Sequence, residues 1–252
     1  MAPRSILLAV LTVVARLAAP AEAVAQKTGW NSTVEANGNV LFGATSQTLT
    51  SLDGDFAHSG PGFSADLGIK FRYGESEDEQ QVKFVSSRSW AATMSVDIRP
   101  QARVSPFAFG SAGASLEKRI DHRESGGVGA KWTFAQTNTG KASVSLAVLG
   151  ERTLPLSDTL TRATSLARWS WRVKLNQRVD DRISFTHVTF YQPAIDALSR
   201  YIFTSTSVGS YAINTGVALT LTFTDNYDSD ARGRGARANN DGSLLFGVRA
   251  TF

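Results

Sequence analysis

Alternating apolar and polar residues run through most of the chain from Trp30 onward. The clearest case is the segment 63–73, in which Leu67 and Phe71 share one parity while Asp66 and Lys70 share the other. Successive side chains of a β-strand point to opposite faces, so this alternation predicts a strand with one apolar and one charged face. No segment shows a sustained helical period, which favours an all-β fold.

Twelve such segments are separated by stretches rich in turn-forming or charged residues. We expect strands at about residues 30–43, 47–58, 63–73, 82–99, 107–118, 128–134, 144–148, 167–176, 182–191, 201–208, 213–223 and 243–252. Pro100 and Pro106 are expected to bracket one of the turns. In the segment 182–191 the apolar parity changes between Phe185 and Val188, which predicts a β-bulge near Thr186.

The repeated apolar face, with Trp and Tyr residues near the strand ends, predicts a twelve-stranded antiparallel transmembrane β-barrel. A closed barrel satisfies every backbone group inside lipid, and its even strand number places both termini on one side, which we expect to be the periplasm. A soluble all-β domain that buries these aromatics is the alternative. The longer, charged segments then become extracellular: 75–81, 117–125, 150–162, 192–199 and 224–241.

The N-terminal residues 1–25 have the pattern of a secretory signal peptide. Arg4 supplies the positive charge, residues 6–14 are apolar, and the small residues Ala23 and Ala25 suit cleavage before Gln26. We therefore expect an exported chain whose residues 26–252 form an outer-membrane β-barrel. The mean hydropathy of −0.12 fits this fold, because only alternate residues of a barrel strand face lipid.

The last strand ends the chain on an aromatic residue. Val248, Ala250 and Phe252 lie on its apolar parity. This ending resembles the C-terminal signature of bacterial outer-membrane proteins. The resemblance implies that these three residues form an insertion signal, and that the partners are the barrel insertion machinery, periplasmic chaperones and outer-membrane lipid.

Composition and charge exclude several classes of protein. Removal of residues 1–25 leaves 24 of the 26 basic residues and 21 of the 22 acidic residues, and no basic stripe stands out. Nucleic acid is therefore not an expected partner. The chain has no cysteine, which excludes disulfides and thiol catalysis. We expect a monomer without a cofactor.

The polar parity of the strands predicts which charged residues face the lumen. Eight of these are basic and three are acidic: Glu35, Asp66, Lys70, Arg72, Asp97, Arg99, Lys131, Arg168, Arg172, Lys174 and Arg249. A water-filled lumen with this excess favours anions, so we expect a narrow passive pore with a mild anion preference or a structural barrel. An interior plugged by ion pairs is the alternative, because twelve strands lie between filled small barrels and open porins.

Enzymatic motifs are weak. Outer-membrane phospholipase, a twelve-stranded barrel that this chain resembles in size, uses an outward-facing His and Ser one residue apart. Here His187-Val188-Thr189 has that spacing with Thr in place of Ser. No pair of His residues has metal-ligand spacing, so we expect no catalytic or metal-binding residues. Lipid hydrolysis at His187, and adhesion or ligand binding through the outer loops, remain alternatives.

The opening segment 30–40 (WNSTVEANGNV), the segment 227–230 (YDSD) and the ending 247–252 (GVRATF) resemble the domain-of-unknown-function 481 family. Members of this family are named as salt-induced outer-membrane proteins. At 43–45 this chain has GAT where the family usually has a Gly-Asn-Thr turn. The resemblance covers essentially residues 26–252. It implies a twelve-stranded outer-membrane barrel and no particular activity.

Overall fold

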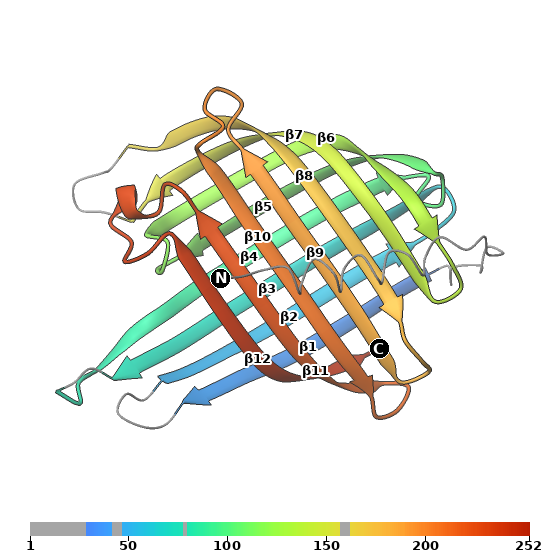
Figure 1. Cartoon of the computed structure of the whole chain (residues 1–252), viewed down its shortest axis with the longest axis horizontal. Coiled ribbons are helices and arrows are strands. Elements are labelled where there is room, and N and C mark those ends of the chain that lie inside the picture. The colour runs from blue at the N-terminus through green and yellow to red at the C-terminus, as the bar shows by residue number, and fades with distance from the viewer. Residues whose placement is uncertain (1–28, 42–46, 78–79, 157–161) are drawn as a thin grey trace, which may run out of the picture.

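Twelve antiparallel strands form a closed barrel in the computed structural model, which describes residues 29–41, 47–77, 80–156 and 162–252 (Figure 1). The strands are β1 (Gly29–Leu41), β2 (Gln47–Ser59), β3 (Phe63–Glu77), β4 (Lys83–Ile98), β5 (Val104–Ser115), β6 (Ile120–Gln136), β7 (Gly140–Pro155), β8 (Thr164–Arg178), β9 (Ile183–Pro193), β10 (Tyr201–Ala212), β11 (Val217–Asp228) and β12 (Asn240–Thr251). Each strand pairs with its neighbours in sequence, and β12 closes the barrel by pairing with β1, with Glu35 opposite Arg249. The all-β, twelve-stranded fold expected from the sequence is confirmed.

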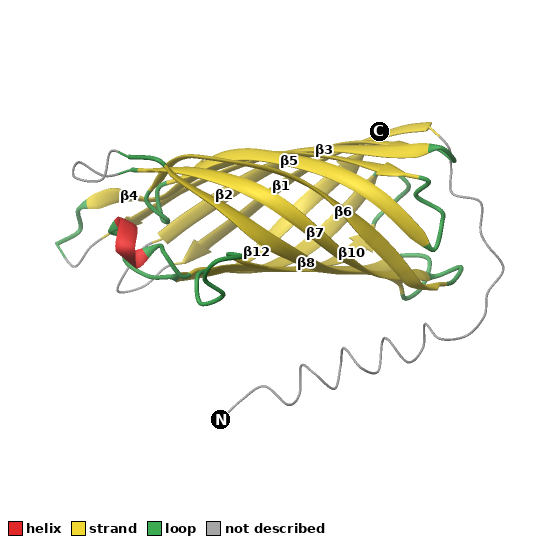
Figure 2. Ribbon diagram, turned by 90° about the horizontal axis from the view of Figure 1, so that it is seen from above, coloured by secondary structure: helices red, strands yellow, loops and turns green. Residues whose placement is uncertain are grey.

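The barrel has two distinct ends. The start of β1 and the end of β12 lie at the terminal end, together with the short turns. The opposite, far end carries the loop between β11 and β12, which contains the short 3₁₀ helix η1 (Arg232–Arg234). Figure 2 shows the loops gathered at the two ends, with η1 at the far end. Among the described residues, no helix is long and apolar enough to cross a membrane.

The outward face of the wall is apolar. Directly paired residues lie on the same face of a sheet, and one such row joins Leu52, Phe71 and Trp90 on β2, β3 and β4. These side chains are 51%, 54% and 38% exposed. The neighbouring row, which contains Asp53 and Lys70, faces inward. Exposed apolar residues of this size around a closed barrel are stabilised by acyl chains, so the outward face is the lipid-facing surface.

The expected β-bulge near Thr186 is absent. Strand β9 pairs with both β8 and β10 without any shift of register. As a result Phe185 faces outward, while Phe190 faces the lumen opposite Arg172. The expectation was wrong because it placed every large apolar residue against lipid. The lumen accommodates the Phe190 ring beside the Arg172 guanidinium, which lies 5.9 Å from the ring centroid.

Several strands are longer than the sequence pattern indicates. Strands β6, β7 and β11 extend into the segments assigned to the loops 117–125, 150–162 and 224–241, and Pro106 lies inside β5. Near the far end these strands carry charged residues on both faces, so the alternation that marks a membrane-facing strand fades there. The expected signal peptide, residues 1–25, lies outside the described residues.

Candidate functional site

The lumen contains a cavity of about 690 Å³. Its lining extends from Asp66 and Arg172 to Lys118 and Asp228 near the far end. Most of the other lining residues are small or polar. A polar lining inside a lipid-facing barrel can hold water, so the cavity is the candidate site for solute binding or passage.

The structure places ten of the eleven predicted lumen residues on the inward face of a strand: Glu35, Asp66, Lys70, Arg72, Asp97, Lys131, Arg168, Arg172, Lys174 and Arg249. The exception is Arg99, which lies in the turn after β4 with a positive φ of 51° and an exposed side chain. The prediction for Arg99 therefore needs correction, because strand β4 ends at Ile98 before the alternation reaches it.

Four of the predicted cations are neutralised by carboxylates. Arg249 Nε donates to Glu35 Oε2 at 2.7 Å, and Lys131 is paired with Asp97. Sequence reasoning missed the other two carboxylates. Asp53, which pairs with Lys70 at 3.5 Å, lies on the strand with the least regular pattern, and Glu151, which pairs with Arg168, lies in a segment assigned to a loop.

Arg168 has the most complete set of partners. Its Nε and Nη2 donate to the two carboxylate oxygens of Glu151 at 3.2 and 3.1 Å, and its side chain is 2% exposed. Its Nη1 donates to the carbonyl oxygens of Gln192 and Arg200 at 3.1 and 3.0 Å. One buried guanidinium thus joins β7 and β8 to the far-end loop between β9 and β10.

Other lumen charges have no such partner. Within the described part of the chain, seven charged residues on the inward strand faces form no ion pair: Asp55, Asp66, Arg72, Lys141, Arg172, Lys174 and, at the terminal end of β8, Arg178. Five of them are cations and two are carboxylates. The lumen therefore keeps an excess of positive charge after the ion pairs are discounted, although this excess is smaller than the sequence indicates.

The far end of the lumen is crossed by side chains from opposite walls. Arg123 on β6 donates to Asp228 on β11 at 2.9 Å, and Arg234 of η1 donates to the same carboxylate at 2.7 Å. Lys118, in the turn between β5 and β6, pairs with Asp241 on β12 at 2.7 Å. Four strands separate β6 from β11 in one direction around the barrel and six in the other. We call these five residues the mouth network, and it narrows the far opening.

The adjacent loop is held by a second ion pair. Arg200 Nη2 donates to Asp230 Oδ2 at 2.9 Å. The pKa of Arg200 is raised, mainly because this hydrogen bond stabilises its charged form. The Asp230 backbone N–H donates in turn to Asp228 at 3.0 Å, so the loop and the mouth network form one connected structure.

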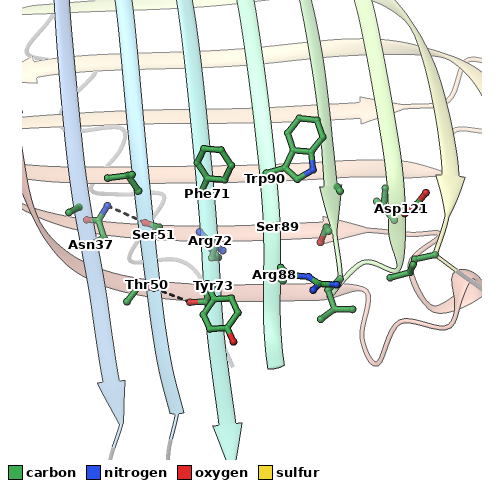
Figure 3. Close-up of a pocket in the computed structure, with 17 residues that line it drawn as sticks. Asn37, Thr50, Ser51, Phe71, Arg72, Tyr73, Arg88, Ser89, Trp90 and Asp121 are labelled. Atoms are coloured by element: carbon green, nitrogen blue, oxygen red, sulfur yellow. Dashed lines mark hydrogen bonds between the residues drawn. The ribbon is translucent and has the colours of Figure 1, made fainter. Parts of the chain in front are cut away.

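A second cleft, of about 720 Å³, lies nearer the far ends of β1–β6 (Figure 3). It is bordered by residues of both faces of the wall: Arg72 belongs to the lumen face, whereas Tyr73 and Trp90 belong to the lipid face. Asn37 Nδ2 donates to Ser51 Oγ at 3.3 Å across β1 and β2 (Figure 3). The cleft therefore has no single chemical character.

His187 faces lipid and is hydrogen-bonded through both ring nitrogens. Its Nδ1 lies 2.8 Å from Ser207 Oγ on β10, and its Nε2 lies 2.8 Å from Thr189 Oγ1. The sequence could not reveal the contact with Ser207, because the two residues are brought together only by strand pairing. No cluster of three or more potential metal ligands occurs among the residues that the structure describes.

A closed antiparallel barrel with an apolar exterior and a charged lumen belongs to the class of bacterial outer-membrane β-barrels. Within that class, the chain belongs to the family described as "Protein of unknown function, DUF481", whose model matches residues 34–252. The family resemblance of the sequence motifs is thereby confirmed. A search among curated proteins finds no match.

Solved structures of several outer-membrane barrels are similar in fold. The translocator domain of the autotransporter NalP from Neisseria meningitidis has a TM-score of 0.50 and 11% identity over 97% of this chain and 94% of its own. The NanC porin has a TM-score of 0.51 and 10% identity over 86% and 98% of the two chains. The COG4313 outer membrane channel from Pseudomonas putida F1 has a TM-score of 0.52 and 8% identity over 92% and 98%.

Proposed function

We propose that this barrel is a narrow passive channel for small solutes across the outer membrane, with a mild preference for anions. The observation that carries the proposal is the polar cavity of about 690 Å³ inside a lipid-facing barrel. Over the inward faces of the strands as a whole, the unpaired charges are mainly positive: Arg72, Lys141, Arg172 and Lys174 outnumber Asp55 and Asp66. Fixed charge of one sign raises the local concentration of the opposite ion.

The narrow far opening supports a low conductance. The mouth network holds the loop of η1 against the turn between β5 and β6, and this contact narrows the far opening of the lumen. Two of the fold neighbours are described as a porin and a channel, which fits this function. We place both termini in the periplasm, because the short turns then lie inside and the longer loops outside.

A catalytic role is not part of the proposal. Thr189, Ser207 and the ring nitrogens of His187 satisfy one another's hydrogen bonds on a surface that faces lipid. Such mutual satisfaction is what polar groups require there, because lipid offers no partner. We therefore expect the purified barrel to release no fatty acid from phospholipid vesicles. Hydrolysis that disappears in His187→Ala would contradict this part of the proposal.

Single-channel recording of the refolded barrel in planar bilayers under a KCl gradient tests the channel function. We expect a small, stable conductance with a reversal potential on the anion side. The double variant Arg172→Gln/Lys174→Gln should shift that potential toward cations. Arg88→Gln, which removes a cation from the outward face, is the matched control and should leave it unchanged. A correctly folded barrel that never conducts would refute the proposal.

A further inference from the structure

Two unpaired carboxylates lie together on one wall of the cavity. Asp55 on β2 and Asp66 on β3 both line it, and they are close enough to interact electrostatically. Gly68 lies directly opposite Asp55 in the β2–β3 pairing. A Cβ at Gly68 would lie 3.2 Å from Asp55 Oδ1 and 2.8 Å from Thr93 Oγ1, so the glycine leaves room for the Asp55 carboxylate beside Thr93.

Two unpaired cations lie on β8, on the other side of the lumen. Arg172 is held between two rings, 5.1 Å from the centroid of Phe107 and 5.9 Å from that of Phe190. Its Nη2 donates to Ser145 Oγ at 3.1 Å, while its buried Nε has no partner within the described residues. Lys174, two residues further along the inward face, is exposed within the lumen.

The acids and the cations face each other across the lumen. Strands β4 to β7 separate β3 from β8 in the barrel order, so the two pairs lie on different walls. Even so, Asp55, Asp66 and Arg172 line the same cavity, Lys174 lies near enough to Asp66 to act on it electrostatically, and Asp66 is one of two carboxylates that act on Arg172. The other is Asp97, which Lys131 neutralises. Lys141 is a further cation near Lys174.

We infer that this part of the lumen selects small zwitterions, in particular amino carboxylates. The inference rests on the proposed channel function and specifies its solute class. Opposed fixed charges with low-dielectric walls create a field across the cavity. A zwitterion lies along that field with its carboxylate toward Arg172 and Lys174 and its ammonium group toward Asp55 and Asp66. A neutral solute of the same size receives no such electrostatic stabilisation from the field.

Isomeric solutes isolate this effect. Alanine and lactamide have the same formula and nearly the same size, but only alanine is a zwitterion at neutral pH. Entry of each into proteoliposomes that contain the full barrel can be followed by osmotic swelling. We expect alanine to enter at least about threefold faster than lactamide. Asp66→Asn and Lys174→Gln should each lower that ratio toward one, with little change in lactamide entry.

Matched variants separate this field from general charge effects. Asp121→Asn and Arg88→Gln remove the same kinds of charge outside this cavity and should keep the wild-type ratio. Equal entry of the two isomers into wild-type vesicles, or a ratio that Asp66→Asn leaves unchanged, would overturn the inference while the channel function stands. Entry of neither isomer, together with absent conductance, would overturn both.

Discussion

Removal of the buried Arg168 guanidinium should destabilise the barrel strongly. Arg168→Ala leaves Glu151, whose side chain is 5% exposed, without its main partner. The contacts that remain are the Thr153 hydroxyl at 3.3 Å and Arg123 Nε at 3.9 Å. Breaking a buried ion pair from one side typically costs about 3–5 kcal/mol. The carbonyls of Gln192 and Arg200 also lose the guanidinium hydrogen bond, at about 0.5–1.5 kcal/mol each, although the Ala194 N–H still donates to the Arg200 carbonyl. We therefore expect Arg168→Ala to lower the free energy of unfolding by an amount in the upper part of the range of about 3–5 kcal/mol.

Urea unfolding in lipid vesicles, followed by tryptophan fluorescence, measures this loss. The matched control is Arg152→Ala, because Arg152 pairs with Glu124 at 3.5 Å while both side chains are more than half exposed, at 65% and 51%. An exposed pair of this kind contributes about 0–1 kcal/mol. The reasoning fails if Arg168→Ala destabilises the barrel no more than Arg152→Ala does.

A second variant tests the cause of the loss. Replacing both partners, as in Arg168→Met/Glu151→Leu, removes the stranded charge and should recover most of the stability, since a buried ion pair can often be replaced by apolar residues at little cost. A double variant that is as unstable as Arg168→Ala would show that the guanidinium acts through the far-end loop rather than through Glu151.

Three further predictions concern other parts of the barrel. Trp171→Arg and Leu221→Arg place a charge on the lipid face and should each oppose insertion by about 2–4 kcal/mol near the midplane, which vesicle refolding titrations measure. Phe252→Ala should lower the amount of assembled barrel in cells while leaving refolding in detergent unchanged; equal losses in both would argue against an insertion signal. Asp228→Asn, which releases Arg123 and Arg234 from the mouth network, should raise single-channel conductance, and an unchanged conductance would mean that the network does not limit passage.

Much of the candidate site could be predicted from the sequence. Alternation placed Asp66, Arg172 and Lys174 on the lumen side, because the side chains of a strand change faces at every residue. It failed at Arg99, where the strand ends one residue earlier. It also failed at Phe190, because an aromatic ring beside a luminal guanidinium breaks the rule that apolar residues face lipid.

The partners of these charges could not be predicted. Glu151 lies opposite Leu166 on β8 and reaches Arg168 diagonally, and Arg123 reaches Asp228 from a strand on the opposite wall. Such contacts depend on the register of every strand pair and on closure of the barrel. No short stretch of sequence contains that information.

The sequence by itself determined the strand number, the lipid-facing surface and the positive bias of the lumen, because each follows from a period of two residues repeated along the chain. Only the tertiary structure decided which charges neutralise one another and which remain free. It also decided that the mouth network crosses the far opening, and that Asp55 and Asp66 face Arg172 and Lys174. The physical reason is that electrostatic energy depends on distance through space, and barrel closure sets those distances.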